Sequence, residues 1–230
     1  LGTLCGCVKK SLRYMPIIGW TLWLGRCNFF LARNWSSDRP YLQTATNRLN
    51  SSRIPFMFVI APEGTRFTAE KQQKCIKYAN EHELEYRLKH HLAPRVKGIA
   101  EVMRCMQQAN ERVDMLAVFN TEFICLADDS HWFNPSVRNF VCGKPFQIDC
   151  NITRVHQFPG AQASDDEYET FVQQQFDLKD RLVEQFEQHG HYGSYATFTE
   201  RYNPWRTFHT FVRFVIVNLV FTTFLIAYGT

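Results

Sequence analysis

The sequence has little of several features that assign a function class directly. Its 26 Lys and Arg residues are nearly balanced by 22 Asp and Glu residues, and the basic residues are spread along the chain. A nucleic-acid interface is therefore not expected. None of the eight cysteines forms a C-x-x-C pair, and no cleavable signal peptide begins the chain, which argues against a disulfide framework and a zinc site. We interpret the cysteines as reduced thiols and expect no metal.

The length and the hydrophobic content are those of a folded chain. With 230 residues, of which 45% are hydrophobic, the chain can build one large domain with its own core. No internal repeat or low-complexity tract divides it. We predict a single domain over residues 1–203, followed by an anchor over residues 208–228.

A long apolar run in the last part of the chain predicts this anchor. At ~1.5 Å per residue, residues 208–228 reach about the ~30 Å of a bilayer core. Arg201, Arg206 and Arg213 stand before or near its start and no charged residue follows, so the positive-inside rule places the preceding domain in the cytosol. We thus expect an integral membrane protein; a buried core helix is the alternative.

A second membrane-seeking segment covers about residues 13–33. Its aromatic and aliphatic side chains, among them Trp20 and Trp23, are flanked by Arg13 and Arg26, as is typical of a headgroup boundary. The segment is too short and too interrupted to span a bilayer. Interfacial docking and ordinary core packing both remain open.

The pattern between these segments predicts an α/β fold. Residues 54–61 form a short apolar run rich in β-formers, as expected for a buried parallel strand. A helix over residues 165–188 is opened by the capping box Ser164-Asp165-Asp166-Glu167 and closed by Gly190. We predict a mixed, mainly parallel sheet flanked by helices, with a C-terminal transmembrane helix.

Another helix is predicted over residues 71–92, although its apolar face is weak. His90 and His91 then stand at its solvated C-terminal end, where imidazole side chains favour the helix dipole. This interpretation assigns the two histidines no role in chemistry.

The motif Glu63-Gly64-Thr65-Arg66 follows the carboxyl end of the predicted strand, where open α/β sheets place their ligands. Arg66 offers a planar, bidentate cation for a phosphate group, and Thr65 offers a hydroxyl. Gly64 lets a ligand approach the backbone, and Glu63 can hold Arg66 or neighbouring amides in place. The combination predicts a phosphate-binding loop, although a surface turn can contain the same residues.

The motif belongs to a set of segments that resembles a known family. An apolar run ends at Arg33, the motif follows, and residues 90–98 centre on Pro94. In this order they resemble the second, third and fourth blocks of the glycerophospholipid acyltransferases, which make phosphatidic acid from lysophosphatidic acid. Phe67-Thr68 and residues 179–186 are similar to the branch that contains the gamma, delta and epsilon forms and lysocardiolipin acyltransferase.

The resemblance implies transfer of an acyl group from acyl-CoA, as co-substrate, to the free hydroxyl of a lysophospholipid in phospholipid biosynthesis. Lysophosphatidic acid is the expected acceptor, with lysophosphatidylinositol or lysocardiolipin as alternatives. No metal or organic cofactor is implied, and the expected location is the endoplasmic reticulum or a related endomembrane. The implied substrate-binding residues are Arg33, Glu63, Gly64, Thr65, Arg66 and Pro94.

The resemblance also assigns roles. Arg66 would bind the acceptor's phosphate with Glu63 orienting it, and Arg33 would be a second cation for acceptor or donor phosphate. Pro94 would shape the acyl-chain tunnel. Lys71, Arg95 and Lys97 are lesser candidates for phosphate contacts and are interpreted as surface charges.

The family's first block, a His separated from an Asp by four residues, supplies the general base and has no counterpart here. None of the eight histidines has an Asp five positions further on. We assign no catalytic residue and expect the block upstream of Leu1. A catalytically inactive lipid-binding protein therefore stays an alternative, and a transmembrane scaffold without a lipid pocket is a third.

Overall fold

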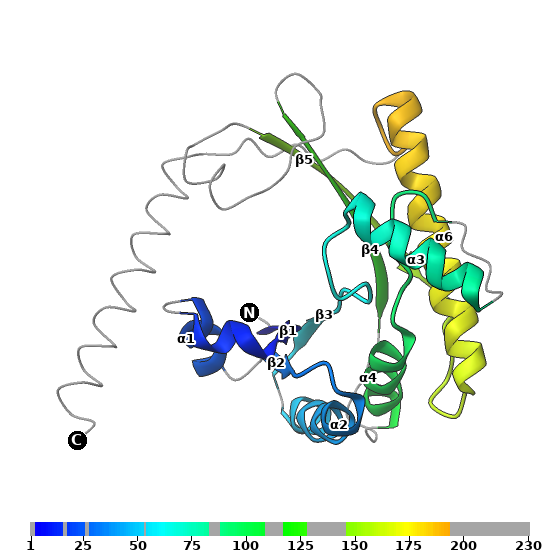
Figure 1. Ribbon diagram of the computed structural model, residues 1–230. Helices are drawn as coiled ribbons and strands as arrows, with labels where there is room; N and C mark the ends of the chain where they lie inside the picture. The colour runs from blue at the N-terminus through cyan, green and yellow to red at the C-terminus, as the bar shows by residue number, and fades with distance from the viewer. Residues whose placement is uncertain are drawn as a thin grey trace. The chain divides into compact units, whose positions relative to one another are not determined.

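The computed structural model describes residues 3–15, 18–25, 28–52, 54–82, 88–108, 117–127 and 146–193. Their helices and strands are labelled in Figure 1. The chain divides into two compact units, of which the first comprises residues 1–60 and 196–230 and the second residues 61–195. The predicted phosphate-binding motif and Pro94 belong to the second unit, and Arg33 belongs to the first.

The first unit contains a parallel sheet of three strands in the order β2-β1-β3. The strands are β1 (Thr3–Lys9), β2 (Asn28–Leu31) and β3 (Phe56–Val59). In the register Val8 lies opposite Phe30 and Cys5 opposite Phe58. Because β2 and β3 both run parallel to β1, the chain leaves both strands at the same edge of the sheet.

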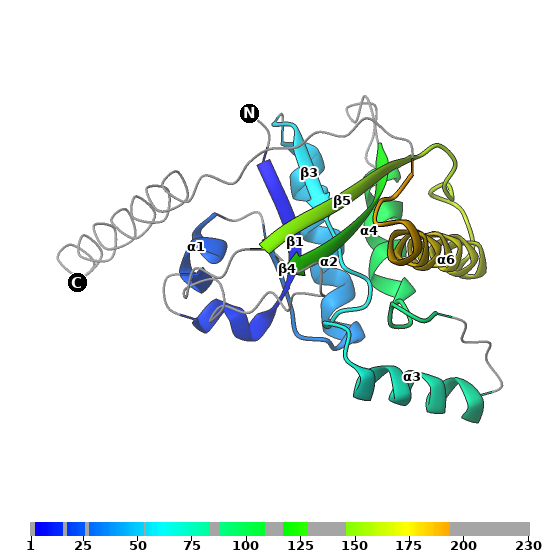
Figure 2. The same cartoon turned by 90° about the horizontal axis from the view of Figure 1, so that it is seen from above.

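Helices connect these strands. The 3-10 helix η1 (Lys10–Tyr14) and α1 (Ile18–Leu24) lead from β1 to β2, and α2 (Trp35–Ser51) leads from β2 to β3. Figure 2 labels α2 together with β1 and β3. The buried positions of α2 recur at helical spacing, and this face packs near β2. They include Leu42, Ala45, Thr46 and Leu49.

An aromatic cluster forms the core beside this sheet. The ring of Phe29 on β2 is fully buried and lies 5.1 Å, centroid to centroid, from Phe58 on β3. The ring of Tyr41 on α2 makes a T-shaped contact with Phe29, with the ring centroids 6.2 Å apart. A parallel strand within residues 54–61 is thus confirmed as β3, but the expected burial is wrong, because β3 lies at the edge of the sheet and leaves Met57 and Val59 exposed.

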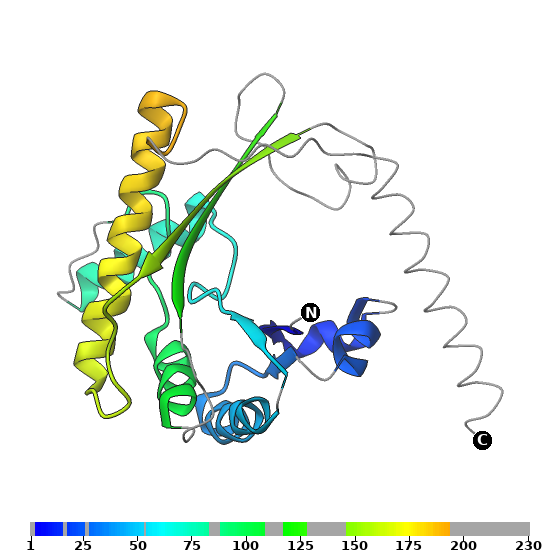
Figure 3. The ribbon, with the colours of Figure 1, turned by 180° about the vertical axis from the view of Figure 1, so that it is seen from behind.

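The second unit contains an antiparallel pair of strands, β4 (Val118–Ala127) and β5 (Phe146–Val155). The long helix α6 (Asp165–His189) lies along β4, as Figures 1 and 3 show from opposite sides. Helix α4 (Val96–Gln108) packs against α6, and α3 (Ala69–Glu81) precedes it in the chain. The predicted helix over residues 165–188 is confirmed, including the capping box and a left-handed Gly190.

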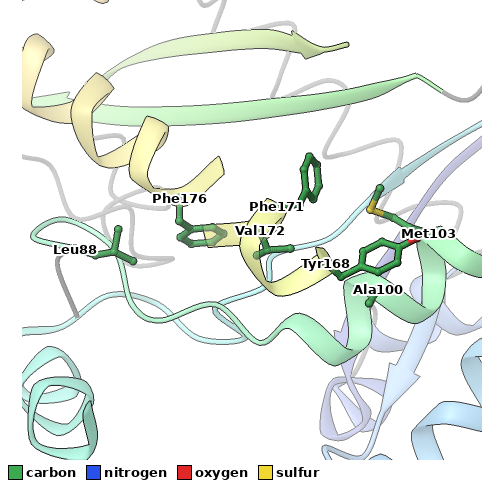
Figure 4. Packing of buried hydrophobic residues seen from close by; sticks show 7 residues of the cluster. All are labelled: Leu88, Ala100, Met103, Tyr168, Phe171, Val172 and Phe176. Atoms are coloured by element: carbon green, nitrogen blue, oxygen red, sulfur yellow. The ribbon is translucent and has the colours of Figure 1, made fainter. Parts of the chain in front are cut away.

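The core of this unit forms between α4 and α6. Figure 4 shows its buried side chains, which come from both helices and from Leu88 in the segment before α4. The members on α6 follow a helical spacing of three and four residues, so one face of the helix is buried. They are Tyr168, Phe171, Val172 and Phe176. Nearer the end of α6, Val183 and Phe186 pack against Ile124 of β4.

A buried network of charged groups interrupts this apolar interface. The His91 ring lies between two carboxylates: Nδ1 is 3.0 Å from Asp180 Oδ1, and Nε2 is 3.0 Å from Glu122 Oε2. Lys179 Nζ lies 3.2 Å from the same Glu122 oxygen. Burial by itself would lower the pKa of His91, but the hydrogen bonds to Asp180 and Glu122 outweigh it and raise that pKa to about 9. The imidazole is therefore protonated at neutral pH and donates from both nitrogens.

The two carboxyl groups respond in the opposite direction. Burial would raise the pKa values of Glu122 and Asp180. Their hydrogen bonds to His91 outweigh burial and lower both pKa values, helped by the charge of Lys179 at Glu122 and by backbone amides at Asp180. Both carboxyl groups are therefore ionised at neutral pH.

Three expectations from the sequence need correction. The described strands form two small sheets, one parallel and one antiparallel, rather than a single mixed sheet. Helix α3 ends at Glu81 instead of continuing to residue 92. His91 is accordingly not at a solvated helix end; only 6% of it is exposed.

The predicted transmembrane helix and integral membrane location are also corrected. Within the part of the chain that the structure describes, no helix is long and apolar enough to cross a bilayer. The physical reason is clearest in α6, which has 25 residues but carries charged side chains throughout its length. Residues 208–228 lie outside the described residues.

The segment over about residues 13–33 is described in part. Trp20 and Trp23 of α1 are exposed, and the Arg13 guanidinium lies 4.5 Å from the centroid of the Trp23 ring. Core packing therefore does not explain these two tryptophans. Docking at an interface stays a prediction.

Loss of the capping box should destabilise the second unit. In Ser164→Ala the Glu167 backbone amide loses its side-chain acceptor, so we expect the free energy of unfolding to fall by about 1 kcal/mol. Urea denaturation measures this. The matched control is Gln188→Ala on the exposed end of the same helix, which should stay within about 0.5 kcal/mol of wild type. Equal losses in the two variants would contradict the role of the cap.

The His91 network predicts how stability depends on pH. Because the pKa of His91 is higher in the folded protein than its ordinary 6.5, its contribution is complete below pH 6.5 and is lost as pH rises through 9. We expect the free energy of unfolding to fall by about 3 kcal/mol over this range. Urea denaturation at several pH values should show the fall in wild type and a much flatter profile in His91→Gln. If wild type and His91→Gln showed the same dependence of unfolding free energy on pH, the role of His91 would be contradicted.

Candidate functional site

The Glu63 motif begins in a tight turn. The Gly64 amide donates to the Ala61 carbonyl at 3.0 Å, with Pro62 at the second position of the turn, where proline is favoured. Gly64 has φ 65°, in the left-handed region that strains residues with a Cβ atom. The turn therefore needs glycine for its backbone conformation, and it leaves Thr65 and Arg66 exposed.

Glu63 is held by the segment around Pro94. Its Oε2 atom accepts a hydrogen bond from the Leu92 backbone amide at 3.0 Å. The Arg95 amide donates to the Pro62 carbonyl at 2.9 Å. These two bonds lie on either side of Pro94 and join the predicted third and fourth blocks. The sequence left open whether Glu63 holds Arg66 or a backbone amide, and the structure shows that it holds the Leu92 amide.

Lys71 proves to be part of the loop. Its ammonium donates to Thr65 Oγ1 at 2.6 Å and to the Arg66 carbonyl at 3.0 Å. The lysine is placed there by the start of α3, where Thr68 caps the helix and accepts from the Lys71 amide. The interpretation of Lys71 as a plain surface charge is therefore wrong, because the side chain bridges the two residues that end the motif.

Two guanidinium groups belong to the loop and its neighbouring segment. The Arg66 side chain is exposed and has no hydrogen bond or ion pair with any residue that the structure describes. The Arg95 side chain runs past Gly64, about 3.9 Å from where a Cβ atom would stand. A guanidinium can bind a phosphate through two parallel N–H donors, so this face of the loop can hold an anion.

Arg33 lies in the first unit, two residues beyond β2. Its φ is 67°, which is uncommon for a residue with a side chain and costs free energy. Asp38 offsets this cost by accepting from the amides on either side, Ala32 at 2.9 Å and Asn34 at 3.1 Å. A strained backbone held by a buried carboxylate is typical of a functional position.

The structure thus brings Glu63, Gly64, Thr65, Arg66 and Pro94 together in one unit and places Arg33 in the other. No group of three or more His, Cys, Asp or Glu residues that could hold a metal occurs among the residues described. Sequence reasoning overlooked Asp38 and the loop contacts of Lys71. A signal for each was present, since Asp38 stands in the first turn of a helix and Lys71 three residues after a helix cap.

Comparison with known proteins gives named relatives. The chain is similar to 1-acyl-sn-glycerol-3-phosphate acyltransferase delta of Homo sapiens, with 29% identity over 220 residues, covering 96% of this chain and 52% of that protein. The protein of the same name in Mus musculus is 30% identical over 182 residues, covering 79% and 45%. 1-acyl-sn-glycerol-3-phosphate acyltransferase 2 of Brassica napus is 30% identical over 184 residues, covering 80% and 44%.

No protein-family model and no solved structure matches the chain. The chain spans about half the length of the curated relatives it matches. The similarity nevertheless extends over most of this chain, in both animal and plant proteins. Over most of its length, the chain is thus similar to 1-acyl-sn-glycerol-3-phosphate acyltransferases of animals and plants.

Proposed function

We propose that the chain carries the phosphate-binding part of an enzyme that transfers an acyl group from acyl-CoA to lysophosphatidic acid. The observation that carries the proposal is the loop after Pro62, in which Glu63 is bonded to the Leu92 amide while the Arg66 guanidinium stays exposed. The names of the relatives support an acceptor with a glycerol phosphate. A loop whose own acid is already occupied leaves its cation available for the ligand.

Arg66 would bind the phosphate of the acceptor through two N–H donors. Because this fixes the glycerol group, it holds the free hydroxyl near the thioester, and much of the gain in rate is positional. Lys71 restrains Thr65 and the Arg66 backbone, so the guanidinium starts from a defined position. Arg95, which runs past Gly64, adds a second positive charge to the loop.

The other predicted residues take supporting roles in the proposal. Pro94 shapes the acyl-chain tunnel, and Arg33 is a second cation for acceptor or donor phosphate. In the reaction, the acceptor hydroxyl loses a proton to a base and attacks the thioester carbonyl, and CoA leaves as the thiol. We assign the base to no residue of this chain. No metal or organic cofactor is part of the proposal.

Loss of the Arg66 guanidinium or of the Glu63 carboxylate should abolish most of the activity. For Arg66→Ala and Glu63→Ala we expect kcat/KM for lysophosphatidic acid to fall by about a hundredfold, since a charged, bidentate contact or its support is lost. Acyl transfer from labelled acyl-CoA, measured with the natural full-length protein, tests this. Arg181→Ala, an exposed arginine on α6, is the control and should behave as wild type. Wild-type turnover in both loop variants would refute the site.

The acceptor distinguishes this function from its alternatives. An acceptor without phosphate, such as a monoacylglycerol, should be a poor substrate for wild type and should lose little more in Arg66→Ala. Lysophosphatidylinositol and lysocardiolipin tested in the same assay reveal another acceptor preference. Binding of lysophosphatidic acid without any transfer by wild type would favour a lipid-binding protein instead.

Lys71 should matter less than Arg66. In Lys71→Met the loop loses two hydrogen bonds from the ammonium but keeps its cation and its turn. We expect KM for lysophosphatidic acid to rise by about tenfold, with kcat changed by less than about threefold. Steady-state kinetics separates the two constants. Lys74→Met, one turn further along α3 and paired with Glu70, is the control that should leave both unchanged.

A further inference from the structure

The segment of residues 88–95 is partly buried and has no regular secondary structure. Leu88, His91 and Leu92 are each less than 7% exposed, although the segment forms neither helix nor strand. Buried backbone amides need acceptors, and here they are supplied by side chains and turns from other parts of the second unit. The position of this segment is therefore set by those partners.

Helix α6 supplies the first set of partners. Asp180 accepts from the Lys89 amide at 2.7 Å, from the His90 amide at 2.8 Å and from His91 Nδ1 at 3.0 Å. One carboxylate thus fixes three consecutive residues. On the far side of the imidazole, Glu122 of β4 accepts from Nε2, so His91 links α6 to β4.

The next residues of the same segment hold the phosphate-binding loop. The Leu92 amide donates to Glu63, and the Arg95 amide donates to the Pro62 carbonyl. His91 and Leu92 are neighbours, so one peptide unit separates the group held by α6 from the group that holds Glu63. A displacement of His91 is passed to Glu63 without any flexible side chain between them.

The charged groups around His91 favour one defined geometry of this segment more than they add to overall stability. Four charged groups are packed here, His91 and Lys179 against Asp180 and Glu122, and the Phe176 ring lies nearly perpendicular to the imidazole, 5.8 Å away between centroids. Buried ion pairs add little net stability compared with apolar packing, because both partners lose hydration. They do restrict the number of arrangements, since each donor must face its acceptor.

We propose that Asp180 and His91 are positioning residues for the phosphate-binding loop, because they fix the backbone that holds Glu63. The inference rests on the proposed function of that loop. Neither residue touches the substrate. They act through the Leu92 amide, and they determine where the carboxylate of Glu63, and hence the turn that presents Arg66, comes to rest.

The test compares two aspartates of α6 in the natural full-length protein. Asp180→Asn removes the charge that the 88–91 backbone requires. Asp177→Asn makes the same chemical change one turn earlier, where the carboxylate accepts a hydrogen bond from Gln173 of its own helix. Hydrogen exchange of residues 60–68 and 88–95 is measured together with the kinetics of acyl transfer.

We expect exchange in both segments to become at least tenfold faster in Asp180→Asn, with α4 and the first half of α6 unchanged. KM for lysophosphatidic acid should rise by about tenfold, while KM for acyl-CoA stays within twofold. Asp177→Asn should match wild type in every measurement. His91→Gln, which keeps an N–H donor for Asp180 but loses the positive charge, should give the same pattern at smaller size.

Three results would overturn the proposal. The first is a folded Asp180→Asn protein in which residues 60–68 exchange as in wild type, because the loop would then not depend on Asp180. Faster exchange over the whole unit in both Asp180→Asn and His91→Gln would assign the network a purely structural role. Equal rises in both KM values would contradict a specific effect on the acceptor. If wild type acylates no lysophosphatidic acid, the proposed function fails, and the exchange measurements still decide the positioning.

Discussion

The second unit depends on the carboxylate of Asp180, which accepts hydrogen bonds from backbone amides that lie outside any helix or strand. The partly buried segment of residues 88–95 belongs to no helix or strand, so its backbone amides need acceptors from other parts of the unit. Asp180 accepts two of these amides and one imidazole nitrogen, and Glu63 accepts the amide of Leu92. The proposed phosphate-binding loop is therefore attached to the core of the unit through backbone groups of one segment, whose position depends on the packing of α6 on β4.

This arrangement explains why an acid opens the family motif. Glu63 is turned toward the 88–95 backbone, so its negative charge is used in holding the loop and does not neutralise Arg66. Near the other end of the motif, Lys71 also holds the loop by donating a hydrogen bond to Thr65. The guanidinium is thus presented from a loop that is tied at both ends, which reduces the ordering that a bound phosphate must impose.

Local signals allowed much of this to be predicted from the sequence. The capping box at Ser164 and the glycine at position 190 fix the ends of α6 within the chain itself, and the β-forming run before Pro62 marks β3. The proposed phosphate-binding motif can be read from the sequence because its residues are consecutive. The sequence showed only that the Pro94 segment follows the motif, and the hydrogen bonds that join the two are seen in the structure.

What the sequence did not reveal depends on residues far apart in the chain. Asp180 and His91 are separated by 89 positions, and no spacing rule connects a helix residue with an irregular segment at that distance. The same limit explains the helix predicted over residues 71–92, because burial by α6 stabilises residues 88–92 in an irregular conformation. The expected transmembrane helix rested on apolar length, and no described helix is both long and apolar enough to cross a bilayer.

Arg33 holds its side chain on a backbone conformation that costs stability. Its backbone lies in a region that glycine or asparagine occupies at little cost, so either residue would relax the turn after β2. Laboratory evolution that rewards heat tolerance alone should therefore replace Arg33 early. Under selection for turnover the arginine should persist together with Asp38, because the buried carboxylate has a purpose only while the turn is strained. The two positions should consequently change as a pair among distant relatives.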